Sequence, residues 1–99
     1  MTTTKDKIAN AFAEQPSADK VNKAYLFGSY ARGSADEKSD VDLCIEPASG
    51  FNFFTLGSLA TNLEEKLGVD VDVVCGEDTF YPKARERYLK DRILIYEKC

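Results

Sequence analysis

The sequence contains no histidine. This absence excludes the commonest general base of enzymes, together with the Ser-His and Cys-His pairs in which a histidine activates a nucleophile. It also argues against a zinc site, because Cys44, Cys75 and Cys99 have neither histidine partners nor CxxC spacing. Their odd number argues against a disulfide framework as well. Any chemistry in this chain must therefore depend on carboxylates or on metal ions that carboxylates hold.

Long hydrophobic runs are also missing. No apolar stretch approaches the ~20 residues that a membrane-spanning helix needs, and residues 1–7 are polar rather than signal-like. We therefore expect a cytoplasmic protein that makes no membrane contact.

Positive charge is scarce, since 13 Lys and Arg residues face 17 Asp and Glu residues for a net charge of −4. A negatively charged protein attracts long duplexes poorly, so no sequence-specific DNA binding is expected. The basic residues gather only near the C-terminus, in a face that is either solvated or meets RNA or an acidic surface of a partner. This cluster consists of Lys83, Arg85, Arg87, Lys90 and Arg92.

The sequence does have the composition of a folded protein, with 43% apolar and 30% charged residues. Its 99 residues are enough for a single domain, residues 1–99, with one modest core. A chain of this length has no room for a second domain that recognises a partner molecule. Whatever accepts the product of the reaction must therefore be supplied by another molecule. A homo- or hetero-oligomer is possible.

The spacing of apolar residues predicts alternating helices and strands. Helical stripes predict helices over residues 5–14, 56–67 and 82–90, and Gly68 marks the end of the second. Alternating or β-branched runs predict strands over residues 21–27, 40–46, 69–75 and 93–96. The β, α, β order indicates an α/β (α+β) domain.

Five aromatic residues require an assignment to the core or to the surface. Tyr25 and Phe27 lie in the first predicted strand and are assigned to the core. Phe51, Phe53 and Phe54 lie in a loop-like stretch, where they either cap the core or form a partner-facing patch. Burial statistics favour the core for these three as well.

Two aspartates separated by one residue, Asp40 and Asp42, lie in the second predicted strand. Because side chains alternate across a strand, both carboxylates project from the same face. Carboxylates held this close repel each other unless a cation lies between them. Oxygen-only ligands select hard ions, so the pair predicts Mg²⁺, or alternatively Mn²⁺, with a nucleoside triphosphate completing the coordination.

A third aspartate, Asp72, lies in the next predicted strand. In a two-metal site the ions lie ~3.5–4 Å apart, with Asp42 as the best bridging ligand and Asp72 on the ion that activates the attacking hydroxyl. Asp70 shares the face of Asp72, so the pattern alone does not separate these two. The alternative for Asp40 and Asp42 is a solvated face of an edge strand.

A glycine-serine turn follows the first predicted strand directly. Gly28 lets the backbone approach a phosphate closely, and Ser29 offers hydroxyl and amide donors at the start of a short helix. Arg32 and the hydroxyl of Ser39 are further candidates for phosphate contacts. These four residues together predict a cradle for a triphosphate.

The string GSYARG at residues 28–33, followed by SDVDL at 39–43, resembles the signature of the polymerase-beta-type nucleotidyltransferase superfamily. VDVV at residues 71–74 resembles its third-carboxylate strand, and the similarity extends to ILIYEK at 93–98. The resemblance is to the minimal, or MNT, branch, and it implies a small mixed β-sheet with helices packed on one side. By this resemblance Gly28 and Ser29 contact the triphosphate, Asp40 and Asp42 bind both metals, and Asp72 is the third catalytic carboxylate.

Family members of this size resemble the antitoxin halves of two-gene modules whose partner is an all-helical HEPN protein. The resemblance implies a transfer of AMP from ATP, with two Mg²⁺ ions, onto a tyrosine hydroxyl of that partner, which blocks the partner's RNase activity. Two alternatives remain open. One is a binding module that inhibits its partner by occlusion alone, and the other is a transferase for a small hydroxyl compound.

Overall fold

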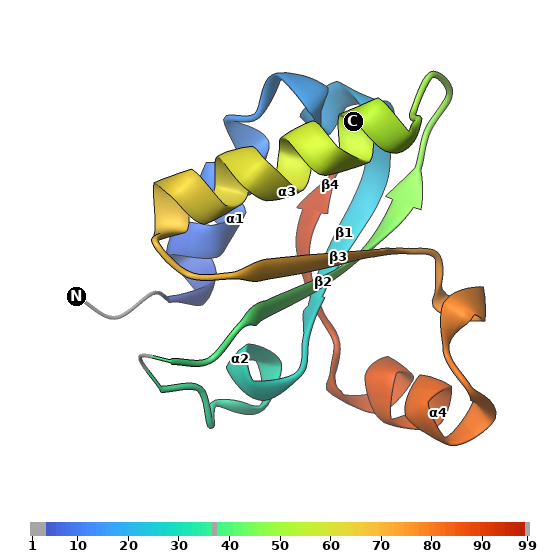
Figure 1. Ribbon diagram of the computed structural model, residues 1–99. Coiled ribbons are helices and arrows are strands. Elements are labelled where there is room, and N and C mark those ends of the chain that lie inside the picture. The colour runs from blue at the N-terminus through green and yellow to red at the C-terminus, as the bar shows by residue number, and fades with distance from the viewer. Residues whose placement is uncertain (1–3, 37, 99) are drawn as a thin grey trace.

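A four-stranded mixed sheet forms the centre of the computed structural model, which describes residues 4–36 and 38–98 and leaves Cys99 outside the described part (Figure 1). The strand order is β3-β2-β1-β4. β1 (Val21–Phe27) runs antiparallel to β2 (Val41–Pro47) and to β4 (Ile93–Glu97). β2 runs parallel to β3 (Val71–Cys75), so the sheet is mixed, as expected.

Four helices and two 3₁₀ turns accompany the strands in the described part of the chain. Asn52 caps the longest helix by accepting a hydrogen bond from the backbone N–H of Thr55, and Gly68 ends the same helix with a φ of 71°. None of the helices among the described residues has the length and apolar character needed to cross a bilayer. The elements are α1 (Lys5–Ala13), η1 (Pro16–Lys20), α2 (Ser29–Arg32), α3 (Phe53–Leu67), η2 (Glu77–Thr79) and α4 (Pro82–Asp91).

The hydrophobic core lies between one face of the sheet and the helices α1 and α3. α1 packs against β4 and α3 against β3, and the two helices also contact each other. Alternation along the strands supplies the sheet side of this core. Its largest fully buried side chains include Ile8, Phe12, Leu26, Leu43, Ile45, Leu59 and Leu63.

The opposite face of the sheet carries Tyr25 and Phe27, which are only partly buried and lie outside the core cluster. Their assignment to the core was wrong because they alternate with the core residue Leu26 and therefore point to the other face. There they meet α4, whose buried Tyr88 has its ring centroid 6.3 Å from that of Tyr25 and 5.3 Å from that of Phe27.

The phenylalanines near the start of α3 are not all in the core either. Phe51 packs partly buried against the core, but Phe53 is 89% exposed and Phe54 is 88% exposed. The reason is that the cap at Asn52 places both exposed residues in the first helical turn, outside the buried stripe of Leu59, Leu63 and Leu67. The core prediction was therefore wrong for Phe53 and Phe54.

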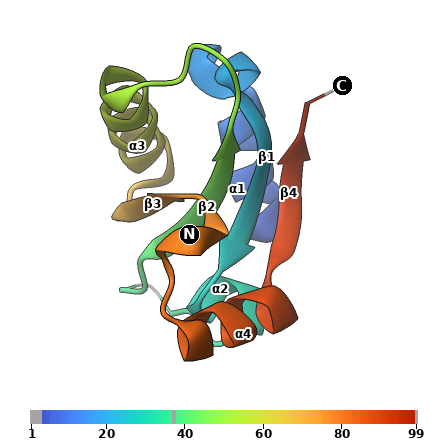
Figure 2. The same cartoon turned by 90° about the vertical axis from the view of Figure 1, so that its right-hand side faces the viewer.

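The helices α2 and α4 lie near each other at one end of the sheet, opposite the loop that joins β2 to α3 (Figure 2). The antiparallel pairing of β1 explains this arrangement, since the end of β1 meets both the beginning of β2 and the beginning of β4. The turn after β1, the aspartates at the start of β2 and the helix before β4 therefore share this end of the molecule.

Candidate functional site

The three predicted carboxylates come from the adjacent strands β2 and β3. Asp42 is directly opposite Asp72 in the parallel register, and Asp40 lies one residue before β2. Asp42 is half-buried, whereas Asp40 and Asp72 are exposed. Burial and then the negative charges of Asp72 and Asp40 raise the pKa of Asp42, while the positive charge of Arg32 lowers it. The structure thus brings all three carboxylates into electrostatic contact.

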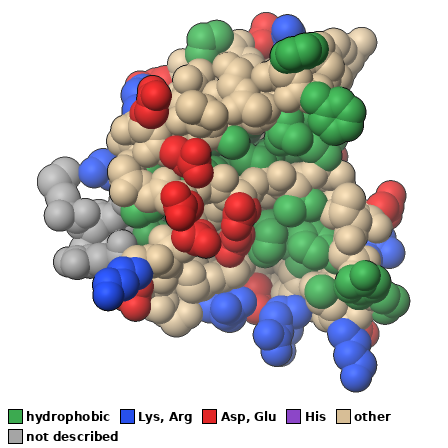
Figure 3. Space-filling view, in the orientation of Figure 1, with side chains coloured by type: hydrophobic (Ala, Val, Ile, Leu, Met, Phe, Trp, Pro, Cys, Tyr) green, Lys and Arg blue, Asp and Glu red, His purple; other side chains and the backbone are tan. Residues whose placement is uncertain are grey.

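Acidic side chains gather in the middle of the face shown in Figure 3, with lysine and arginine side chains along its lower edge. Within residues 4–36 and 38–98, no group of three Asp, Glu, Cys or His side chains is arranged to hold one metal ion. The exposed side chains of Asp40 and Asp72 can rotate toward Asp42 without disturbing the core. The donors are carboxylate oxygens only, and they are already repelling one another, so the set fits a hard divalent cation.

Asp70 and Asp72 differ in their positions, although the sequence pattern treats them alike. Asp70 precedes β3, and its backbone carbonyl accepts a hydrogen bond of 2.9 Å from the N–H of Val41. The charge that perturbs Asp42 from β3 is that of Asp72. The geometry therefore favours Asp72 as the partner of Asp42, and its catalytic role stays a prediction.

The turn after β1 is fitted closely around Asp42. Gly28 has φ 75° and ψ −151°, a backbone conformation that is essentially restricted to glycine. A Cβ built at Gly28 would overlap Oδ2 of Asp42 and would lie 3.2 Å from its Cγ. The short helix α2 starts at Ser29 and ends at Arg32, and its C-cap Gly33 has a φ of 74°. The glycine at position 28 thus allows the glycine-serine turn to pack directly against the carboxylate of Asp42.

The two remaining candidates for phosphate contacts have different surroundings. Arg32 is exposed on α2 and is close enough to Asp42 to act on its pKa. The hydroxyl of Ser39 donates a hydrogen bond of 3.2 Å to Asp36 and accepts one of 2.9 Å from the N–H of that residue. Ser39 therefore stabilises its own loop in this structure, and since a hydroxyl has one proton to donate, its phosphate contact stays a prediction.

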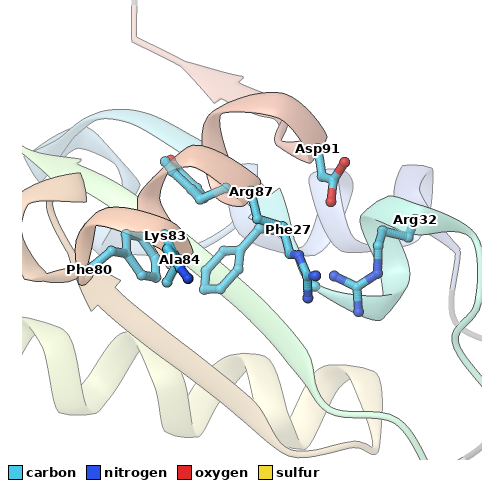
Figure 4. Close-up of a pocket in the computed structure, with 9 residues that line it drawn as sticks. Phe27, Arg32, Phe80, Lys83, Ala84, Arg87 and Asp91 are labelled. Atoms are coloured by element: carbon cyan, nitrogen blue, oxygen red, sulfur yellow. The ribbon is translucent and has the colours of Figure 1, made fainter.

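A cavity of about 450 Å³ opens beside the turn, between α2, the end of β1 and α4 (Figure 4). Gly28 and Arg32 line one side, and Lys83 and Arg87 of α4 line the other. Sequence reasoning did not place these α4 residues at the site. Their i, i+4 spacing puts them on one face of a helix, but only the tertiary structure shows what that face meets.

The residues of the predicted basic cluster have different surroundings, and two of them contact Glu77 rather than the cavity. Arg85 pairs with Glu77 at 2.9 Å, and Arg92 lies 3.8 Å from the same carboxylate. The guanidinium of Arg92 also stacks over the ring of Tyr25, with its Cζ 4.2 Å from the ring centroid. Arg85 and Arg92 thus connect α4 and its C-terminal end to Glu77, and Arg92 also connects them to Tyr25.

The comparisons with known proteins agree with this geometry. The family model described as "Polymerase beta, Nucleotidyltransferase" matches residues 6–99. The Methanocaldococcus jannaschii protein named "Putative protein adenylyltransferase MJ0435" is 37% identical over 73 residues, which are 74% of this chain and 77% of that protein. The Shewanella oneidensis "Protein adenylyltransferase MntA" is 36% identical over 55 residues, which are 56% of this chain and 40% of that protein.

Solved structures show the same fold. A protein described as a "putative minimal nucleotidyltransferase" superimposes with a TM-score of 0.73 and 31% identity, over 92% of this chain and 95% of that one. A toxin-antitoxin complex with AMP-PNP superimposes with a TM-score of 0.71 over 97% of this chain and 75% of the matched chain. At 24% identity, this second match supports the fold alone.

A mixed sheet with a glycine-serine turn set against neighbouring aspartates defines an enzyme of the nucleotidyltransferase class. The chain belongs to the polymerase beta nucleotidyltransferase family, whose model covers nearly all of it. It is a nucleotidyltransferase that resembles protein adenylyltransferases.

Proposed function

We propose that this protein transfers AMP from ATP to a hydroxyl of a partner protein, and that it thereby acts as the antitoxin of a HEPN-type RNase toxin. The observation that carries the proposal is the contact between Gly28 and Asp42, because it joins the phosphate-binding turn to the carboxylates. The relatives named protein adenylyltransferase support the reaction. Neighbours that share the fold are toxin-antitoxin complexes, one of which contains a tri-AMPylated HEPN toxin, and the partner class is proposed by analogy with them.

In this proposal, the residues of the turn and the three aspartates have separate roles in the reaction. Gly28 and Ser29 bind the triphosphate through the turn, and Arg32 neutralises part of its charge. Asp40, Asp42 and Asp72 hold divalent cations, for which Mg²⁺ is the natural choice and Mn²⁺ a substitute. Such cations, when bound, lower the pKa of the acceptor hydroxyl and offset the charge of the leaving pyrophosphate.

The acceptor hydroxyl comes from another molecule. The carboxylates of Asp40 and Asp72 are exposed, so a partner's side chain can reach them without any rearrangement of the core. The cavity beside the turn is a cradle of modest size rather than an enclosed pocket for a second small substrate. Both features favour a protein acceptor over a small hydroxyl compound.

Labelled transfer tests the proposal. The purified protein is incubated with Mg²⁺, α-labelled ATP and lysate of its native cell, and the label on any HEPN-type chain, identified by mass spectrometry, is counted. Wild type is expected to label it, EDTA to prevent labelling, and Asp42→Asn to reduce it by about a thousandfold, since metal ligation contributes several kcal/mol. Asp70→Asn is the matched control and is expected to label normally.

The toxin's RNase activity distinguishes transfer from occlusion. If transfer is the function, Asp42→Asn binds the toxin but leaves its RNase active. An Asp42→Asn protein that still silences the RNase, or a wild type that labels nothing with any of the four nucleotides, would overturn the proposal in favour of a binding module.

A further inference from the structure

The cavity beside the turn has cationic walls on two sides. Arg32 projects into it from α2, while Lys83 and Arg87 project from successive turns of α4. Figure 4 shows the guanidinium groups of Arg32 and Arg87 pointing toward one another. Asp91 is the acidic residue of the lining, so the cavity has a net charge of two positive units. Like charges converge on this cavity although the whole chain is negative.

These cations lack the ion-pair partner that Arg85 and Arg92 of the basic cluster have. In the part of the chain that the structure describes, ion pairs to Glu77 hold Arg85 and Arg92, and no ion pair is formed by Arg32, Lys83 or Arg87. Guanidinium groups that face each other repel, Asp91 offsets only one of the three positive charges of the lining, and a bound anion removes the remaining repulsion. The arrangement is therefore that of an anion site.

The remaining wall of the cavity strengthens this attraction. Phe27, Phe80 and Tyr88 form a packed aromatic cluster, in which the rings of Phe80 and Tyr88 stack with centroids 4.8 Å apart. An apolar wall lowers the local dielectric constant and concentrates the field of the cations facing it. An anion held there would be bound more strongly than one at an open basic surface.

We infer that Lys83 and Arg87 of α4 bind the outer phosphates of the nucleotide, and that they hold the pyrophosphate portion between themselves and Arg32. The inference rests on the proposed function and adds a second wall to its phosphate site. Gly28 links the two regions, because it contacts Asp42 on one side and lines the cavity on the other. A triphosphate whose reacting end lies at Asp42 and Asp72 therefore has its outer phosphates on the α4 side.

Binding of inorganic tripolyphosphate, measured by calorimetry with Mg²⁺, tests this site without any transfer step. Arg87→Gln and Lys83→Gln are each expected to weaken tripolyphosphate and ATP binding by about tenfold or more, since each removes charge-assisted hydrogen bonds. Binding of AMP, which lacks the outer phosphates, should change less than twofold, roughly. Lys90→Gln is the matched control, because Lys90 lies on the same helix but outside this cavity.

The outcomes separate this inference from the proposed function. Arg87→Gln and Lys83→Gln proteins that bind tripolyphosphate as Lys90→Gln does would overturn the inference, even if wild type labels its partner. A loss of equal size for AMP and for tripolyphosphate would also overturn it, since that indicates a general charge effect. If the two variants lose affinity for tripolyphosphate but not for AMP, while the wild-type protein labels nothing in the transfer assay, the phosphate site is upheld and the proposed transfer is overturned. Thermal melting of each variant confirms that the fold is intact.

Discussion

The backbone of Gly28 lies against the carboxylate of Asp42, with no space between them for a side chain. Gly28 directly follows β1, whose last residue, Phe27, is opposite Asp42 in the antiparallel register. The positive φ of Gly28 turns the chain away from the sheet at this point. The conformation of one glycine thus positions both the turn proposed to bind phosphate and the half-buried carboxylate.

Gly28→Ala is expected to damage both activity and stability. The new Cβ overlaps Asp42, and alanine does not tolerate the backbone conformation, so the free energy of unfolding should fall by about 1–2 kcal/mol. Displacement of Asp42 by a fraction of an ångström to an ångström should reduce transfer by about a hundredfold. Urea unfolding and labelled transfer measure the two effects.

Gly33→Ala is the control for backbone strain alone. Gly33 also has a positive φ, 74°, but a Cβ there meets nothing within 4 Å. We expect it to lose about 1 kcal/mol of stability and to keep its activity. If both alanine variants lost activity to the same extent, the contact with Asp42 would not be the cause.

Asp72→Asn and Asp70→Asn separate two residues that share a sequence pattern. Asp72 is opposite Asp42 in the β2-β3 register, so its replacement should reduce labelled transfer by about a thousandfold. Asp70 contributes a backbone carbonyl to the start of β2, which asparagine retains, so transfer should stay within about twofold of wild type. If Asp70→Asn lost most of the labelled transfer and Asp72→Asn lost little, Asp70 rather than Asp72 would be the third carboxylate of the site.

The raised pKa of Asp42 predicts a pH dependence of stability. Burial, together with the charges of Asp72 and Asp40, raises this pKa above the ordinary value of 3.8, so the folded protein binds the proton more tightly than the unfolded chain. The free energy of unfolding therefore falls as pH rises through the raised pKa. In EDTA, wild type should lose stability relative to Asp42→Asn as pH rises from the ordinary pKa of 3.8 through the raised pKa, and the loss is limited because the group is partly exposed.

Urea titrations of the two proteins across this pH range measure the difference, and the other carboxylates cancel in the comparison. Mg²⁺ added at neutral pH should stabilise wild type more than Asp42→Asn, because it binds the folded site that the variant lacks. If the free energies of unfolding of the two proteins changed in parallel with pH, the prediction that Asp42 has a raised pKa in the folded protein would be wrong.

Secondary structure was predictable because its signals are local. The first predicted strand, residues 21–27, coincides with β1, and the helix predicted from Pro82 to about residue 90 coincides with α4 within one residue. Proline at a helix start and Gly68 at a helix end restrict the backbone through their own covalent structure. The mixed sheet followed from the family resemblance rather than from these signals.

The contents of the site depend on pairings between distant segments, which no local pattern contains. The register of β1 with β2 and β4 directs Phe27 toward α4, and only then do Lys83 and Arg87 face Arg32. The exposure of Phe53 could not be predicted either, because it depends on the residue at which α3 begins. Asp40 and Asp42 could be grouped beforehand because their spacing places both on one face of a strand, whereas Asp72 was chosen over Asp70 by the family resemblance. Their catalytic role stays a prediction.

The attachment of α4 to the sheet provides a last prediction. Arg92 stacks over Tyr25 and lies 5.5 Å from the ring centroid of Tyr88, while Glu77 balances its charge. Arg92→Ala should lower the free energy of unfolding by about 1–2 kcal/mol, because a partly desolvated cation–π contact and its aliphatic packing are both lost. Lys90→Ala, an exposed position on the same helix, should change it by less than about 0.5 kcal/mol.

Arg92→Lys distinguishes stacking from charge. Lysine keeps the positive charge near Glu77 but lacks the planar guanidinium that covers the ring of Tyr25, so most of the loss seen with alanine should remain. Urea unfolding of the three variants gives this ranking directly. Full rescue by lysine would mean that the ion pair with Glu77, rather than the stacked guanidinium, holds α4 against the sheet and keeps Lys83 and Arg87 beside the turn.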